Sequence, residues 1–184
     1  MKLTPLLLGV LMATASCNKS NIIDEIFNPE AFHNRAVGAS AKEYLAADKY
    51  TSLQVEVQYM TGFAPDAAAI DHLKNFLSTY LNKPSGIAVT TKEISASSNT
   101  TLSIDNVIAL EKSNRSLFSS GDQMALYILY TNGEFTDSKV LGAAYRNTSA
   151  VIFGKKIRDN SGGLTQPSRT KLEATVLEHD QSAA

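Results

Sequence analysis

The chain has 184 residues, a formal net charge of −1 from 17 basic and 18 acidic side chains, and 43% hydrophobic residues. This length suits one domain with a tail, and the apolar fraction is enough for a sizeable core. The balanced charge provides no basic surface for a nucleic-acid backbone, so we expect no nucleic-acid partner. The chain has a single cysteine, which excludes an intramolecular disulfide and a thiolate zinc cluster.

The N-terminus has the layout of a secretory signal peptide. A short positive start at Met1-Lys2 precedes a mostly apolar stretch from Leu3 to Ala15, which is too short to span a bilayer. The small residues Ala15 and Ser16 come directly before Cys17, as in the lipobox of bacterial lipoproteins. We therefore expect residues 1–16 to be removed and Cys17 to be lipidated, with an ordinary cleaved signal and a chance cysteine as the alternative. The protein is expected to be exported and anchored to the bacterial cell envelope, in the outer membrane.

Residues 17–50 are predicted to form a lipid-anchored tether and a packing arm, because they show no clear hydrophobic period. A short helix is expected within Ala39–Lys49, and no functional role is expected for His33, which lies in this segment. The folded part is predicted to span residues 51–184.

Alternation of apolar and polar residues from Leu53 to Tyr59 predicts a half-buried strand. Pro65-Asp66 is expected to open a helix with one apolar face that continues to Leu81. A second strand is predicted over Ile87–Ile94, and Ser103 is expected to cap a helix that continues to about Lys112.

The run from Gln123 to Thr131 predicts a strand that is buried on both faces. Two short strands are predicted over Val140–Tyr145 and Ala150–Phe153, and the residues between them could close a hairpin. A last helix is predicted from Pro167, with Thr165 or Gln166 as its cap and with Leu172, Val176 and His179 on one stripe. This order predicts an α/β (α+β) fold in which helices cover a mixed, largely parallel sheet.

Three segments resemble parts of the zincin-type metallopeptidases: the strands Leu141-Gly-Ala-Ala-Tyr145 and Ala150-Val-Ile-Phe-Gly154, and the stretch Arg169-Thr-Lys-Leu-Glu-Ala-Thr-Val-Leu-Glu-His179. The chain is most similar to metzincin-like lipoproteins of Bacteroidetes-type bacteria. The resemblance implies a zincin-like N-terminal subdomain with an antiparallel edge strand that holds extended peptide substrate. The residues implied for that strand are Leu141, Gly142, Ala143, Ala144 and Tyr145. A proline at Ala143 is expected to block such pairing.

The resemblance also places His179 at the first zinc ligand and Asp180 at the position of the catalytic glutamate. Ala183 stands at the position of the second zinc histidine, and the third ligand has no counterpart. Zinc is the cofactor of the intact family, in which it activates a water for peptide-bond hydrolysis. One imidazole is not a zinc site, so we expect this chain to bind no zinc stably and to be inactive as a peptidase. The motif is expected to be cut short within a shortened active-site helix, so the subdomain is incomplete at its C-terminus.

Three functional readings remain open. The chain is a member of a secreted metallopeptidase lineage, a non-enzymatic surface lipoprotein that binds extended peptide at the edge strand, or a defective, truncated gene product.

Overall fold

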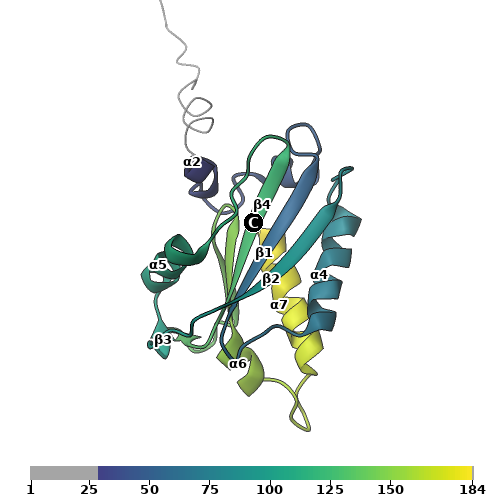
Figure 1. Ribbon diagram of the computed structural model, residues 1–184. Helices are drawn as coiled ribbons and strands as arrows, with labels where there is room; N and C mark the ends of the chain where they lie inside the picture. The colour runs from purple at the N-terminus through teal and green to yellow at the C-terminus, as the bar shows by residue number, and fades with distance from the viewer. Residues whose placement is uncertain (1–28, 184) are drawn as a thin grey trace, which may run out of the picture.

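The computed structural model describes residues 29–183, with side chains described for residues 30–179 (Figure 1). Its helices and strands follow in this order: α2 (Pro29–His33), α3 (Ala41–Leu45), β1 (Ser52–Met60), α4 (Ala67–Tyr80), β2 (Ile87–Ile94), β3 (Thr101–Leu102), α5 (Ile104–Asn114), β4 (Gln123–Thr131), β5 (Glu134–Phe135), β6 (Gly142–Arg146), β7 (Ser149–Phe153), α6 (Gly154–Asp159) and α7 (Arg169–Ala183). None of the helices in the described part of the chain is long and apolar enough to cross a membrane.

Five strands form the main sheet in the order β2-β1-β4-β7-β6. The first four run parallel, and β6 runs antiparallel to β7 at one edge. The short strands β3 and β5 form a separate parallel pair. The predicted fold class is thus confirmed: a mixed α/β fold with a mostly parallel sheet, one antiparallel edge strand and covering helices.

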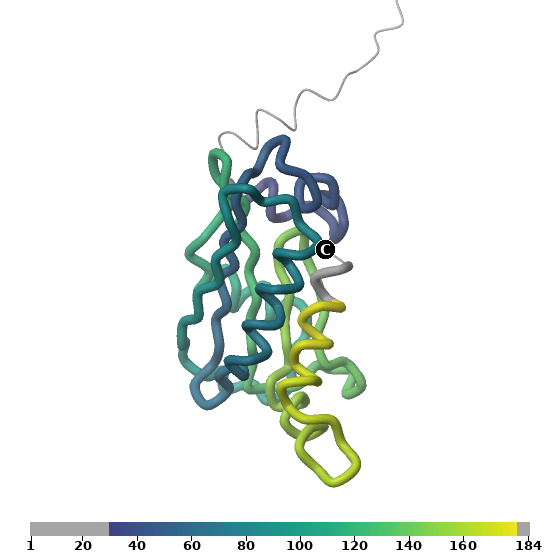
Figure 2. The backbone as a smooth tube through the Cα atoms, turned by 90° about the vertical axis from the view of Figure 1, so that its right-hand side faces the viewer, coloured from purple at the N-terminus to yellow at the C-terminus, as the bar shows by residue number. Residues whose placement is uncertain are grey.

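Helices cover both faces of this sheet. Figures 1 and 2 show α4 and α7 side by side over one face, where they enclose the larger core. Helix α5 lies over the other face, where a smaller apolar cluster forms. The larger core is built from buried residues of β1, β4 and the two helices, among them Val55, Val57, Leu126, Ile128, Leu73, Leu77, Val176 and Leu177.

The first strand is more deeply buried than its alternation predicts. Glu56 and Gln58 face the α5 side and are 4% and 0% exposed. The carboxylate of Glu56 accepts hydrogen bonds from Ser116 N (3.1 Å), Ser116 Oγ (2.6 Å) and Leu117 N (2.9 Å). The prediction of a half-buried strand was therefore wrong, because Glu56 binds the backbone of the segment that follows α5 and Gln58 donates to the carbonyl of Asn114 at the end of α5.

Side-chain caps fix the starts of the long helices. Asp66 accepts from the backbone of Ala68 (3.0 Å) at the start of α4, and Ser103 forms a capping box with Asn106 at α5. Both starts were predicted. Helix α7 begins two residues later than expected, and Ser168 caps it by accepting from Lys171 N (3.3 Å). The expected cap at Thr165 or Gln166 is thus wrong.

The segment before residue 51 packs closely on the domain. Phe32, Tyr44 and Tyr50 are buried and join the larger core. The ammonium group of Lys83 donates to three carbonyl oxygens of this segment, those of Glu43 (2.6 Å), Ala46 (2.7 Å) and Tyr50 (2.9 Å). These contacts tie α3 and the start of β1 to the end of α4. The boundary at residue 50 itself stays a prediction.

Candidate functional site at the antiparallel edge strand

Strand β6 lies at the edge of the sheet, where the sequence places a peptide-binding strand. Four of the five predicted residues, Gly142–Tyr145, are in β6, and Leu141 precedes it. Along the described chain, β6 pairs with β7 on one side and with no strand on the other. Its residues are all half-buried.

The register decides which backbone groups of β6 face outward. The carbonyl of Leu141 accepts from Phe153 N (2.9 Å), so these two residues form a hydrogen-bonded pair. In an antiparallel ladder such pairs alternate, and Ala143 therefore also bonds to β7. The N–H and C=O groups of Gly142 and Ala144 point away from β7. A proline at Ala143 would break the sheet itself, and Ala144 is the residue whose N–H a ligand strand would use.

A β-bulge ends the regular part of β6. The register shifts between Ala144 and Arg146, so Tyr145 is the extra residue. Burial raises the pKa of the Tyr145 hydroxyl well above its usual value, with the Glu111 carboxylate acting in the same direction. The bulge turns Arg146 toward α2, where its Nη1 lies 3.0 Å from Nε2 of His33.

Helix α7 packs beneath β6 and β7 and against α4. Its buried residues are Glu173, Ala174, Val176 and Leu177. The predicted stripe of Leu172, Val176 and His179 is only partly correct, because Leu172 is half-buried and His179 is exposed. One imidazole thus stands at the surface near the end of α7.

A buried carboxylate that the sequence pattern missed fixes the start of α7. Glu173 is 2% exposed, accepts from Asp66 N (2.7 Å) and pairs with Arg169 Nε (2.6 Å). It therefore joins the first turns of α4 and α7. Since both of its oxygens are engaged, Glu173 is not available as a metal ligand.

The residues that the structure describes do not fit a zinc site. No group of three or more His, Cys, Asp or Glu residues in the described part of the chain could hold a metal ion. The side chain of Asp180, and Cys17 as a whole, lie outside the described residues. Ala183, one helical turn after His179, has no donor atom.

A buried polar cluster joins α2, α5 and the β6–β7 hairpin. His33 is 4% exposed, and its Nδ1 lies 2.8 Å from Nη1 of Arg115. Arg115 pairs with Glu111 (2.9 Å), whose Oε1 also accepts from Ser149 Oγ (2.6 Å). Burial lowers the pKa of His33 from 6.5 to about 4, helped by Arg115 and opposed by Glu111. His33 is therefore a neutral structural residue and not part of a loose tether.

The hairpin turn is bound by the same N-terminal segment. Asn147 donates from Nδ2 to Phe32 O (3.0 Å) and to Ser40 Oγ (2.9 Å), and its backbone N–H donates to Arg35 O (3.0 Å). The hydroxyl of Tyr44 donates to Asn147 O (3.3 Å). The end of β6 is thus held in place by residues 32–44. No sequence pattern indicated this contact, because it joins positions more than one hundred residues apart.

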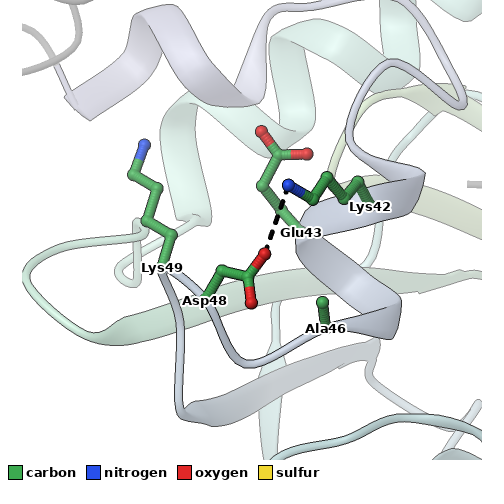
Figure 3. Close-up of a pocket in the computed structure, with 5 residues that line it drawn as sticks. All are labelled: Lys42, Glu43, Ala46, Asp48 and Lys49. Atoms are coloured by element: carbon green, nitrogen blue, oxygen red, sulfur yellow. Dashed lines mark ion pairs between the residues drawn. The ribbon is translucent and has the colours of Figure 1, made fainter.

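The surface has small hollows at both ends of this N-terminal segment. One, of about 150 Å³, lies beside α3 and is crossed by an ion pair between Lys42 and Asp48 at 3.2 Å (Figure 3). Both side chains of that pair are largely exposed, so the hollow has no buried polar group to bind a ligand. The second, of about 220 Å³, lies between α2 and α5 at the Arg146 end of β6.

No protein-family model and no curated protein matches the chain. Among solved structures, it is similar to the crystal structure of archaemetzincin from Methanopyrus kandleri, with a TM-score of 0.49 and 14% identity. The similarity covers 72% of this chain and 73% of the other. A similarity this low does not show a shared activity.

Proposed function

We propose that this protein is an exported member of a zincin-type metallopeptidase lineage that binds extended peptides along the open edge of β6. Lipid attachment at Cys17 would hold it at the cell envelope. The observation that supports peptide binding best is the register of β6, which directs the backbone groups of Gly142 and Ala144 away from the sheet. Two outward residues on one strand are what a peptide needs in order to add a strand by main-chain hydrogen bonds.

The composition of β6 makes it a better edge for peptide binding than the opposite edge of the sheet. Gly142, Ala143 and Ala144 have small side chains or none, so a second backbone can approach closely. The opposite edge strand, β2, has Lys92 and Glu93, and charged side chains on an edge oppose pairing with another strand. The hairpin contacts of Asn147 also hold β6 in place before a ligand arrives, which lowers the entropy cost of binding.

Peptide-bond hydrolysis by this chain is not part of the proposal. The lineage would use two histidines four residues apart on α7, and the second position is Ala183. His179 alone cannot bind zinc firmly. Stoichiometric zinc binding together with cleavage of an unfolded protein substrate, both lost on His179→Ala, would contradict this view.

The test is the affinity of a fluorescently labelled, Thr- and Val-rich peptide for the wild type and for Ala144→Pro. Proline at residue 144 removes an outward N–H without removing a hydrogen bond to β7. We expect binding to weaken by about tenfold or more, because a bound carbonyl loses its donor.

Thr91→Pro is the matched control. The parallel register of β1 and β2 directs the N–H of Thr91 outward at the opposite edge. This variant should bind the peptide as the wild type does. Equal affinities for all three proteins, or a loss confined to Thr91→Pro, would rule out β6 as the binding edge.

A further inference from the structure

The cavity of about 220 Å³ at the end of β6 is lined from three directions. Helix α2 and the residue after it contribute Glu30, His33 and Asn34; α5 and the segment after it contribute Ile108, Glu111, Lys112 and Phe118; and the end of β6 contributes Arg146. Arg146 is the last residue of β6, so the strand ends at this cavity.

The charged groups in and beside the cavity carry an excess of positive charge. Two guanidinium groups, those of Arg115 and Arg146, contact the single carboxylate of Glu111 at 2.9 Å and 3.7 Å. His33 lies between the two guanidinium groups, and its lowered pKa keeps it neutral. At the cavity mouth, the charges of Lys112 and Glu30 are opposite. The cluster therefore carries one positive charge that no carboxylate of the cluster neutralises.

Arg146 is the cation of this cluster that is placed to bind an anionic group. Its Nη1 is directed to His33 and lies 3.7 Å from Oε2 of Glu111, whereas Arg115 and Ser149 engage Oε1 of that carboxylate. Within the described part of the chain, Nε and Nη2 of Arg146 donate to no group, and the side chain is 23% exposed. A guanidinium with one side held and the other side open is suited to bidentate binding of a carboxylate.

We propose that this cavity binds a carboxylate of the peptide that pairs with β6, and that Arg146 thereby determines specificity for acidic peptides. The inference rests on the proposed function, because β6 brings the peptide to the cavity. Arg146 is two residues beyond Ala144, with the bulge at Tyr145 between them. The carboxylate therefore belongs to the end of the paired peptide segment, as an Asp or Glu side chain or as the chain terminus.

The test compares three forms of one Thr- and Val-rich peptide with an acetylated N-terminus. The first has Glu near one end and an amidated C-terminus, the second has Gln in place of that Glu, and the third has Gln with a free C-terminal carboxylate. Wild-type protein is expected to bind the form that has the correct carboxylate about tenfold more tightly than the Gln amide. A preference for the first form identifies a side chain as the source, and a preference for the third identifies the terminus.

Arg146→Gln should remove this preference, and Arg146→Lys should keep only part of it. Lys112→Gln, which alters an exposed cation of the same cavity, should change the preference by no more than about threefold. Equal affinity of the wild type for all three peptides would overturn the carboxylate site and leave edge binding intact. A preference that survives in Arg146→Gln, with unfolding temperature unchanged, would overturn the role of Arg146.

Acetate is a probe that does not depend on peptide pairing. Titration of acetate should shift the NMR signal of the Arg146 Nε–H in the wild type, and Lys112→Gln should respond in the same way. If acetate shifts this signal but no peptide binds, the proposed function fails and the carboxylate site remains. If acetate leaves the signal unmoved and peptides bind without preference, the carboxylate site fails and the proposed function remains.

Discussion

Replacing His33 by Gln should remove a specific loss of stability at mildly acidic pH. His33 is buried between Arg115 and Arg146, with Glu111 and Ser149 also facing its ring. Its pKa falls from 6.5 to about 4 on folding, mainly because burial penalises the charged form. The unfolded chain therefore binds the proton more strongly. The stabilisation by neutral His33 is complete above pH 6.5 and is lost as the pH falls from 6.5 toward 4.

The expected size follows from these two pKa values. Linkage gives a loss of about 2 kcal/mol in the free energy of unfolding between pH 7 and pH 5, and about 3 kcal/mol by pH 4. Urea unfolding of the wild type and of His33→Gln at the same three pH values measures it, because the carboxylates that also titrate there are common to both proteins. The wild type should lose about 2 kcal/mol more than the variant between pH 7 and pH 5. Parallel losses in the two proteins would refute the reasoning.

Three other predictions concern different parts of the fold. Glu56→Ala should lower the free energy of unfolding by about 3 kcal/mol, because it removes the carboxylate that accepts from the part-buried N–H groups of Ser116 and Leu117, and Glu56→Gln should cost less. Urea unfolding tests both, and equal effects would contradict the role of the acceptors. Lys83→Met should cost about 2 kcal/mol through the loss of three carbonyl partners, whereas Lys74→Met, at an exposed position of α4, should be close to neutral by the same assay. Zinc and a chelator should leave the unfolding temperature unchanged, and a zinc-dependent rise at a stoichiometry of one would contradict the absence of a site.

Elements with a strong local signal could be predicted from the sequence. Strands β2 and β4 have the predicted limits: β4 is an almost continuous apolar run, and β2 is rich in β-branched residues and ends at Ile94. Helices α4 and α5 are capped by Asp66 and Ser103, whose side chains accept hydrogen bonds within the same few residues. The antiparallel edge strand, predicted over Val140–Tyr145, was placed two residues early at its start and one residue early at its end.

Elements fixed by distant contacts could not be predicted in this way. The short helix α6 depends on the burial of Ile157 and has too few residues to show a period. The start of α7 depends on Ser168 and on Glu173, which bonds to the first turn of α4. Likewise, the sequence pattern of Glu56 is that of a solvent-facing strand residue. Its burial depends on the hydrogen bonds that its carboxylate accepts from Ser116, sixty residues later.

The candidate site likewise has one part that could be predicted from the sequence and one part that could not. The family resemblance pointed to β6, and the register then showed that Ala144, rather than Ala143, presents its backbone outward. His33 lies in a stretch without periodicity, and its partner Arg146 lies 113 residues away. A polar residue of this kind gives no sequence signal, because its burial depends on guanidinium and carboxylate groups that only the folded chain brings together.

The most direct test of the central claim is amide hydrogen exchange along β6 with and without bound peptide. In the free protein, Ala143 N–H should be protected by β7, and the amides of Gly142 and Ala144 should exchange rapidly. Saturating peptide should slow exchange at Gly142 and Ala144 and leave the outward amide of Thr91 in β2 unchanged. Protection that appears at Thr91, or no change at Ala144 when peptide is bound, would contradict peptide binding at the edge of β6.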